Sequence, residues 1–207
     1  MPGMLVQLLF TDPSLFLMVA TSILLALSIH EYSHAQMAYF LGDPTAKNQG
    51  RLTINPFAHL DPIGTILLFL IGIGWGKPVP FNPYNLKNRK RGELLVGLAG
   101  PGSNFIAALI VGFFLRFSGV TNPGLLFFLS FFVWINLVLG VFNLMPIPPL
   151  DGSHIFFSFP RIERFKMFFL RNSLLMIFAV ILFMRYIGLP FIVGPLYVLF
   201  TGTYPLF

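Results

Sequence analysis

Long apolar runs with almost no charge constrain this sequence more than any other feature. Residues 125–145 contain no Asp, Glu, Lys or Arg, and residues 94–117 and 167–184 contain one basic residue each. A helix needs about 20 such residues to cross the hydrocarbon core of a bilayer. Only 10% of the residues are charged and 56% are hydrophobic, whereas soluble domains carry about 25% charged residues. A water-soluble monomer is therefore excluded, and we predict an all-α polytopic membrane protein.

We expect about five to six transmembrane helices in a single membrane domain that covers residues 1–207. Its core extends over about residues 15–155, and C-terminal helices follow at about 167–207. The candidate spans are 15–41, 94–117, 125–145, 167–184 and 186–207, the last of which several glycines and prolines interrupt.

The basic residues predict how these helices are oriented. They concentrate in segments 42–59, 77–92 and 146–171, while the connection 118–124 has no charge. Short segments rich in Lys and Arg stay on the cytoplasmic side. We therefore expect those three segments in the cytoplasm and the N-terminus outside. Because the basic residues lie in short loops, the net charge of +6 indicates membrane orientation and no nucleic-acid partner.

Residues 63–75 are apolar but too few for a regular span, and basic segments flank them on both sides. A crossing would place one basic segment outside, so we expect a re-entrant loop here. Residues 50–55 alternate weakly between polar and apolar side chains, which predicts a short strand or hairpin at the membrane surface. Residues 77–83 contain three prolines and are therefore expected to be extended or turning.

Residues 30–34 read His-Glu-Tyr-Ser-His, an H-E-x-x-H pattern inside the first span. His30 and His34 are four positions apart and share one helix face, from which both imidazoles reach a single metal ion. Glu31 reaches a water on that metal without being a ligand. Zinc lowers the pKa of such a water to about 7, and a carboxylate then takes its proton as general base.

A polar helix that contacts lipid headgroups is the alternative interpretation of these three residues. It fits poorly, because residues 22–29 and 35–41 are almost all apolar. A carboxylate near the centre of a transmembrane helix costs about 2.5–3.5 kcal/mol, and such residues usually mark function. The chain has no Cys, so thiolate ligands and cysteine nucleophiles are excluded.

Catalytic zinc needs a third protein ligand and an open position for water. Asp151 stands out because it follows residues 146–149, where three prolines end the third long helix and leave irregular backbone near membrane depth. Such backbone is tolerated only where protein buries it or where it lines a wet cavity. The predicted topology also places Asp151 on the histidine side. The full set of candidates is Asp12, Asp43, His59, Asp61, Glu93, Asp151, His154 and Glu163.

HEYSHA at 30–35 and NLMPIPPLDG at 143–152 together resemble the site-2 protease family of intramembrane zinc metalloproteases. RLTINPFAHLDPIGT at 51–65 and AGPGSN at 99–104 resemble its compact prokaryotic branch, which lacks a PDZ domain. The resemblance implies one zinc ion per chain, a prokaryotic cell membrane, an active site toward the cytoplasm, and membrane-anchored substrates such as regulators of transcription. The implied site residues are the ligands His30, His34 and Asp151, the catalytic base Glu31, and Asn143 as an assistant to the substrate or the oxyanion.

The sequence thus predicts an endopeptidase that hydrolyses peptide bonds within or near transmembrane helices of other proteins. A membrane zinc transporter or metal sensor with the same ligands is the alternative, and an inactive scaffold is a third. Glu31 favours the protease, because transport needs ligands but no general base beside them.

Five further residues receive simpler interpretations. We expect Asn136 to pack against a neighbouring helix, and His59 and His154 to have surface or supporting roles. Gly100 and Gly102 are expected to allow a close helix contact or a break opposite the metal.

Overall fold

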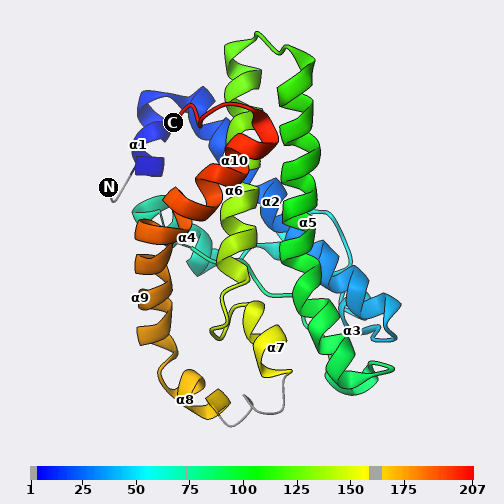
Figure 1. The fold of residues 1–207 in the computed structure, drawn as a ribbon. Helices are drawn as coiled ribbons and strands as arrows, with labels where there is room; N and C mark the ends of the chain where they lie inside the picture. The colour runs from blue at the N-terminus through cyan, green and yellow to red at the C-terminus, as the bar shows by residue number, and fades with distance from the viewer. Residues whose placement is uncertain (1–3, 73, 159–164) are drawn as a thin grey trace.

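Three long helices pack against one another through the centre of the structure: α2 (Pro13–Phe40), α5 (Arg89–Ser118) and α6 (Pro123–Asn143) (Figure 1). The computed structural model describes residues 4–72, 74–158 and 165–207. At the start of each helix a side chain accepts a hydrogen bond from the backbone N–H three residues later, which caps the helix. The capping residues are Asp12, Asn88 and Asn122.

A fourth long helix is continuous over Ser173–Thr201. It consists of α9 (Ser173–Phe183), the π-helical segment η4 (Met184–Val193) and α10 (Gly194–Thr201). Four helices in the described residues are therefore long and apolar enough to cross a membrane, fewer than the five to six expected. The reason is that the wider π-helical turns accommodate Pro190 within the helix, so the two predicted C-terminal spans merge into one.

The long helices alternate in direction, so their connections gather at two ends of the molecule. Figure 1 shows the connection between α5 and α6 at one end, and α3 (Thr45–Asn48), α7 (Gly152–Phe157) and α8 (Lys166–Arg171) at the other. The end with α3, α7 and α8 carries most of the basic residues, as the charge pattern predicted. Arg161 and Arg164, which also entered that prediction, lie outside the described residues.

The segment expected to be re-entrant folds back on itself. Helix α4 (Pro62–Ile71) leaves the bundle and the chain returns, so that Leu60 and Gly76 form an isolated antiparallel β-bridge. Helix α4 packs against α1 (Met4–Thr11), and its Phe69 ring lies 5.5 Å from the ring of Phe16. Because Leu60 and Gly76 are paired, the two ends of the segment lie next to each other.

Residues 50–55 form no strand, which corrects the sequence-based expectation for this segment. The Asn55 N–H donates to Thr53 Oγ1 over 3.1 Å, and Asn55 Oδ1 caps the 3₁₀ turn η1 (Pro56–His59). Such local bonds satisfy groups that a strand would offer to a neighbour. The bridge between Leu60 and Gly76 is the β pairing found in the described part of the chain.

The apolar core lies between α5, α6 and the C-terminal helix. Large apolar side chains also cover the outside of the bundle, including Leu174 at 84% exposure and Phe117 at 74%. A soluble monomer rarely exposes such surface, whereas lipid tails would cover it. The buried core residues are Ala108, Val133, Leu137, Val141, Leu150, Val180, Met184, Val193 and Tyr197.

Candidate metal centre

The two histidines of the H-E-x-x-H pattern meet Asp151 in the interior of the protein. His30 and His34 lie one turn apart on α2, and their Nε2 atoms are 3.0 Å apart. Asp151 immediately precedes α7, where the proline segment ends, and its Oδ2 lies 3.0 Å from His30 Nε2 and 3.2 Å from His34 Nε2. The residues predicted as ligands therefore converge on one point.

The hydrogen bonds behind each imidazole define which ring nitrogen faces that point. His34 Nδ1 lies 2.7 Å from the Val96 carbonyl oxygen, and His30 Nδ1 lies 2.6 Å from Asn104 Oδ1. Both partners are acceptors, so each Nδ1 carries the proton and each Nε2 presents a lone pair. Two imidazole lone pairs and the Asp151 carboxylate thus face one another, a set of donors that a bound metal cation would satisfy.

The donor set and its spacing fit zinc. Two imidazole nitrogens and one carboxylate oxygen are a known ligand set for catalytic zinc, and bonds of about 2.0–2.1 Å in tetrahedral geometry place ligand atoms about 3.3 Å apart. The separations of 3.0–3.2 Å match that spacing closely. Asp151 would supply the single carboxylate oxygen of this set, beside the two imidazole nitrogens.

Asn104 is a member of the site that the sequence analysis did not assign. It is fully buried on α5, and its Nδ2 donates to Ala26 O over 3.1 Å and to Asn136 Oδ1 over 2.8 Å. The amide of Asn136 in turn donates to Phe132 O over 2.8 Å. This chain of amides fixes the Asn104 oxygen toward His30 and gives Asn136 a supporting role beyond packing.

Gly100 lies directly over the imidazoles. A Cβ at this position would stand 2.7 Å from His30 Nε2 and closer still to His34 Nε2. The absence of a side chain therefore lets α5 cover the metal centre, as the close-contact interpretation predicted. A Cβ at Gly102 would meet no atom within 4 Å, so this glycine is not required for that contact. Asn104 follows Gly100 by four positions and therefore shares its helix face, but the sequence alone does not show that this face meets His30.

Glu31 lies beside the ligands and bonds to a different part of the chain. Its Oε2 accepts a hydrogen bond of 2.8 Å from the backbone N–H of Val79, the one N–H in the sequence Pro78-Val79-Pro80. Glu31 is 9% exposed and lines a cavity of about 120 Å³. The other residues around that cavity are His34, Pro78, Val79, Phe81, Val96, Gly97, Pro149, Asp151 and His154.

Residues 77–82, the covering segment, are held in place on both sides of Val79. The Lys77 carbonyl accepts a hydrogen bond of 2.6 Å from Arg51 Nη2, and the Lys77 N–H donates to His59 O over 2.8 Å. Beyond Val79, the Asn82 N–H donates to Asp43 Oδ2 over 2.6 Å. The covering segment is thus a fixed wall of the cavity.

His59 is fully buried away from the three ligands. Its Nε2 donates to Thr53 O over 2.8 Å, and Arg51 Nη2 lies 3.5 Å from its Nδ1. It therefore supports the covering segment, as the supporting interpretation predicted. His154 lines the cavity, with its ring 5.7 Å from that of Phe81.

Asn143 points back to its own helix, where its Nδ2 donates to Leu139 O over 3.0 Å. Its catalytic assistance stays a prediction.

The other acidic candidates for a metal ligand have different roles. Asp12 and Asp61 cap helices, and Glu93 pairs with Arg89 over 2.9 Å. Glu163 lies outside the described residues, among which His30, His34 and Asp151 form the group able to hold a metal ion.

Similarity to known proteins agrees with this geometry. The family model described as Peptidase family M50 matches residues 118–185. The chain is 43% identical over 158 residues to the "Putative zinc metalloprotease YwhC" of Bacillus subtilis, with 72% of each chain covered. It is 31% identical over 144 residues to the "Putative zinc metalloprotease Rip2" of Mycolicibacterium smegmatis, covering 66% of this chain and 55% of that one. Over 45 residues it is 44% identical to "Protease RseP" of Photorhabdus luminescens, covering 22% of this chain and 19% of that one. No solved structure matches significantly.

Proposed function

This chain belongs to peptidase family M50, the site-2 protease family of zinc metalloproteases, and from that premise we propose that it hydrolyses peptide bonds within or near transmembrane helices of other proteins. One observation carries the proposal. Glu31 lines the same cavity as His34 and Asp151, two of the three residues whose ligand atoms converge. It lies on α2, which is long and apolar enough to cross a membrane. Transport needs ligands but no general base beside them.

We assign the residues the following roles. His30, His34 and Asp151 would hold the zinc ion, which when bound polarises the scissile carbonyl and acidifies the attacking water. Glu31 takes the proton from that water and passes it to the leaving amine. The Val79 N–H holds Oε2 of this carboxylate and leaves Oε1 for the water. Asn143 donates to the oxyanion once its amide leaves the Leu139 carbonyl.

The size of the cavity defines the form in which a substrate reaches Glu31. A helix with side chains is about 10–12 Å across, and a cavity of about 120 Å³ does not admit one. The substrate therefore enters as an unwound, extended segment, which also exposes the carbonyl that an intact helix keeps in its own hydrogen bonds. The family to which the chain belongs adds membrane-anchored proteins, such as regulators of transcription, to this proposal as substrates.

The orientation follows from the end of the bundle that carries the basic residues. We place that end in the cytoplasm and the connection between α5 and α6 outside. The chain has no Cys, so a single engineered Cys is a unique label. Ser118→Cys should react with an impermeant thiol reagent added to intact cells, and Asn88→Cys only after lysis. Labelling of Asn88→Cys in intact cells would contradict this orientation.

Replacement of Glu31 by Gln tests the catalytic proposal. Gln keeps the size of the side chain but cannot accept a proton, so cleavage of a membrane-embedded peptide in liposomes should fall by about 10²–10⁴-fold. Zinc content, measured in the same samples, should stay near that of the parent protein. Unchanged cleavage by the zinc-loaded variant would remove the general base. Zinc flux that survives Glu31→Gln, with no cleavage by either protein, would favour the transporter.

A further inference from the structure

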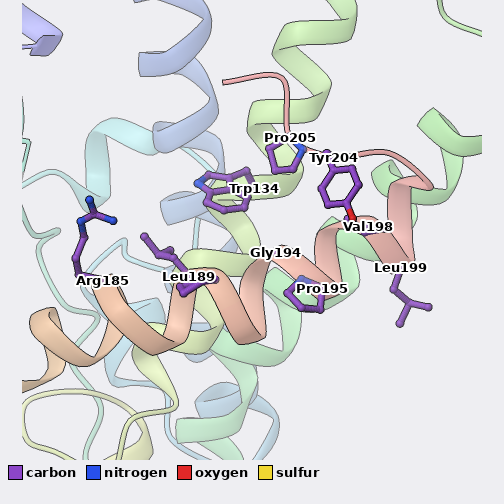
Figure 2. A pocket seen from close by; sticks show the side chains of 10 residues that line it. Trp134, Arg185, Leu189, Gly194, Pro195, Val198, Leu199, Tyr204 and Pro205 are labelled. Carbon is purple, nitrogen blue, oxygen red and sulfur yellow. The ribbon is translucent and has the colours of Figure 1, made fainter.

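A second cavity is lined by none of the residues His30, Glu31, His34 and Asp151. It has a volume of about 860 Å³ and opens between α6 and the C-terminal helix (Figure 2). No residue lines both this cavity and the one that contains Glu31. Its walls are mostly apolar, and its one charged member is Arg185. The lining residues are Trp134, Arg185, Leu189, Pro190, Gly194, Pro195, Val198, Leu199, Tyr204 and Pro205.

The cavity lies near the middle of the membrane-spanning helices. Trp134 is at the centre of α6, eleven positions after Pro123 and nine before Asn143. Arg185 is twelve positions after Ser173, or about 18 Å along the helix at 1.5 Å per residue. Figure 2 shows its guanidinium at one side of the cavity, with the Trp134 ring over the apolar floor. A hydrocarbon core is about 30 Å thick, so a crossing by the helix Ser173–Thr201 places Arg185 in the middle third of the span.

Arg185 has no anionic partner in the described part of the chain. It is exposed, and the ion pairs found there involve other residues. Of the seven acidic residues in the sequence, Glu31 and Glu93 are those within the four spanning helices. Glu31 belongs to the metal centre and Glu93 pairs with Arg89. A second copy of the chain therefore offers no free carboxylate at this depth.

We infer that this cavity binds a transmembrane segment of a partner protein that carries an Asp or Glu near its middle. An unpaired arginine at the centre of a span costs about 2.5–3.5 kcal/mol or more, so a group that neutralises it gains affinity. A lipid phosphate lies in the headgroup layer, about 15 Å from the bilayer centre, and the mid-span position of Arg185 therefore favours a carboxylate on a helix. Leu189, Val198 and Leu199 provide the apolar surface for the flanking side chains of that helix.

Trp134 makes binding measurable. The chain has two tryptophans, Trp75 and Trp134, so Trp75→Phe leaves Trp134 as the single fluorescent donor in the cavity wall. The probe is a synthetic Leu/Ala transmembrane helix with a central Glu and a dansyl acceptor, titrated into phosphatidylcholine liposomes that contain the full chain. We expect saturable energy transfer from Trp134. A probe with a central Gln, or the additional change Arg185→Gln, should weaken binding at least about tenfold.

Two further variants complete the test: one reverses the charge of Arg185, and the other removes a different arginine as a control. Arg185→Glu should lose the Glu probe and bind a probe with a central Lys. Arg171→Gln removes an arginine of α8 that does not line the cavity, and binding should survive this change. Equal binding of the Glu and Gln probes would overturn the inference. So would displacement of the Glu probe by phosphatidylglycerol, which would identify a lipid phosphate as the occupant. Peptide cleavage by Arg185→Gln should be unchanged, so this result is independent of the proposed function.

Discussion

Two different kinds of structure flank the metal centre, and they hold different parts of it. On one side α5, a regular helix, supplies the Val96 carbonyl and the Asn104 amide oxygen to the two imidazoles. On the other side the covering segment, extended and rich in proline, supplies the Val79 N–H to Glu31. The predicted ligands are thus oriented by helix packing, and the proposed base by a loop.

Because different segments hold the predicted ligands and Glu31, zinc retention and turnover should be separable by mutation. Disturbance of the α5 side should change how well zinc is retained, because it releases the imidazoles. Disturbance of the covering segment should change turnover while zinc stays bound, because it releases only Glu31. Zinc content and cleavage rate, measured in the same samples, distinguish the two sides.

The largest expected effect is that of the third ligand. Asp151→Ala should lose most bound zinc and all cleavage, because two imidazoles alone hold the ion weakly. Zinc is counted by mass spectrometry in purified protein. His59→Ala and His154→Ala are the controls, since His59 bonds to Thr53 O and His154 lines the cavity outside the ligand group. Retention of zinc by Asp151→Ala, with its loss in either control, would show that the ligand is misassigned.

The next largest effect is expected on the α5 side, at Asn104, whose side chain is hydrogen-bonded to His30. Asn104→Ala removes the acceptor that fixes His30, and zinc affinity or cleavage should fall by about 10–100-fold, the range typical of groups that orient metal ligands. Zinc affinity is measured by competition with a chelator. Asn143→Ala is the matched control, because that amide bonds within its own helix and its loss should leave zinc affinity unchanged. Equal affinities in the two variants would mean that α5 does not orient His30.

The two sides also differ in how far the sequence predicts them. The histidines and Glu31 follow from spacing within one helix, and Asp151 from the proline break before it, because these signals are local. Asn104 is visible in the sequence only as one polar residue of AGPGSN, since its contact with His30 depends on the register in which α5 packs on α2. The catalytic role predicted for Asn143 rests on its place in the same motif as Asp151, NLMPIPPLDG.

The covering segment and the C-terminal helix were harder still to predict. The prolines of 77–83 correctly exclude a helix, but they give no partner for the Val79 N–H, which finds Glu31 48 positions away in the chain. Likewise, Pro190 predicts a break between two spans, whereas tertiary packing keeps η4 helical and one span results. In both cases contacts between distant segments decide the outcome, and a single sequence carries no record of them.

The smallest effect is expected at Asp43, the anchor beyond Val79. This carboxylate is fully buried and accepts hydrogen bonds from the N–H of Thr45 over 3.0 Å, the amide of Asn85 over 2.8 Å and the N–H of Asn82 over 2.6 Å. Asp43→Asn presents an amide to some of these donors and should loosen the covering segment. Zinc content should remain that of the parent, while cleavage falls several-fold. A loss of zinc from Asp43→Asn would show that the covering segment also controls zinc retention, and the proposed difference between the two sides would then be wrong.

The pH dependence of the same variant tests whether the charge of Asp43 is responsible. Burial raises the pKa of Asp43, but its hydrogen bonds lower it by more, so the folded pKa lies below the ordinary value. A depressed carboxyl pKa stabilises the fold above the unfolded pKa of about 3.9, and this contribution is lost as the pH falls through the folded value. The parent should therefore melt above Asp43→Asn at pH 7, and the gap should narrow below about pH 4. Melting is followed by tryptophan fluorescence in detergent. A gap of constant size from pH 7 to pH 3 would show that shape, and not the carboxylate charge, anchors the covering segment over Glu31.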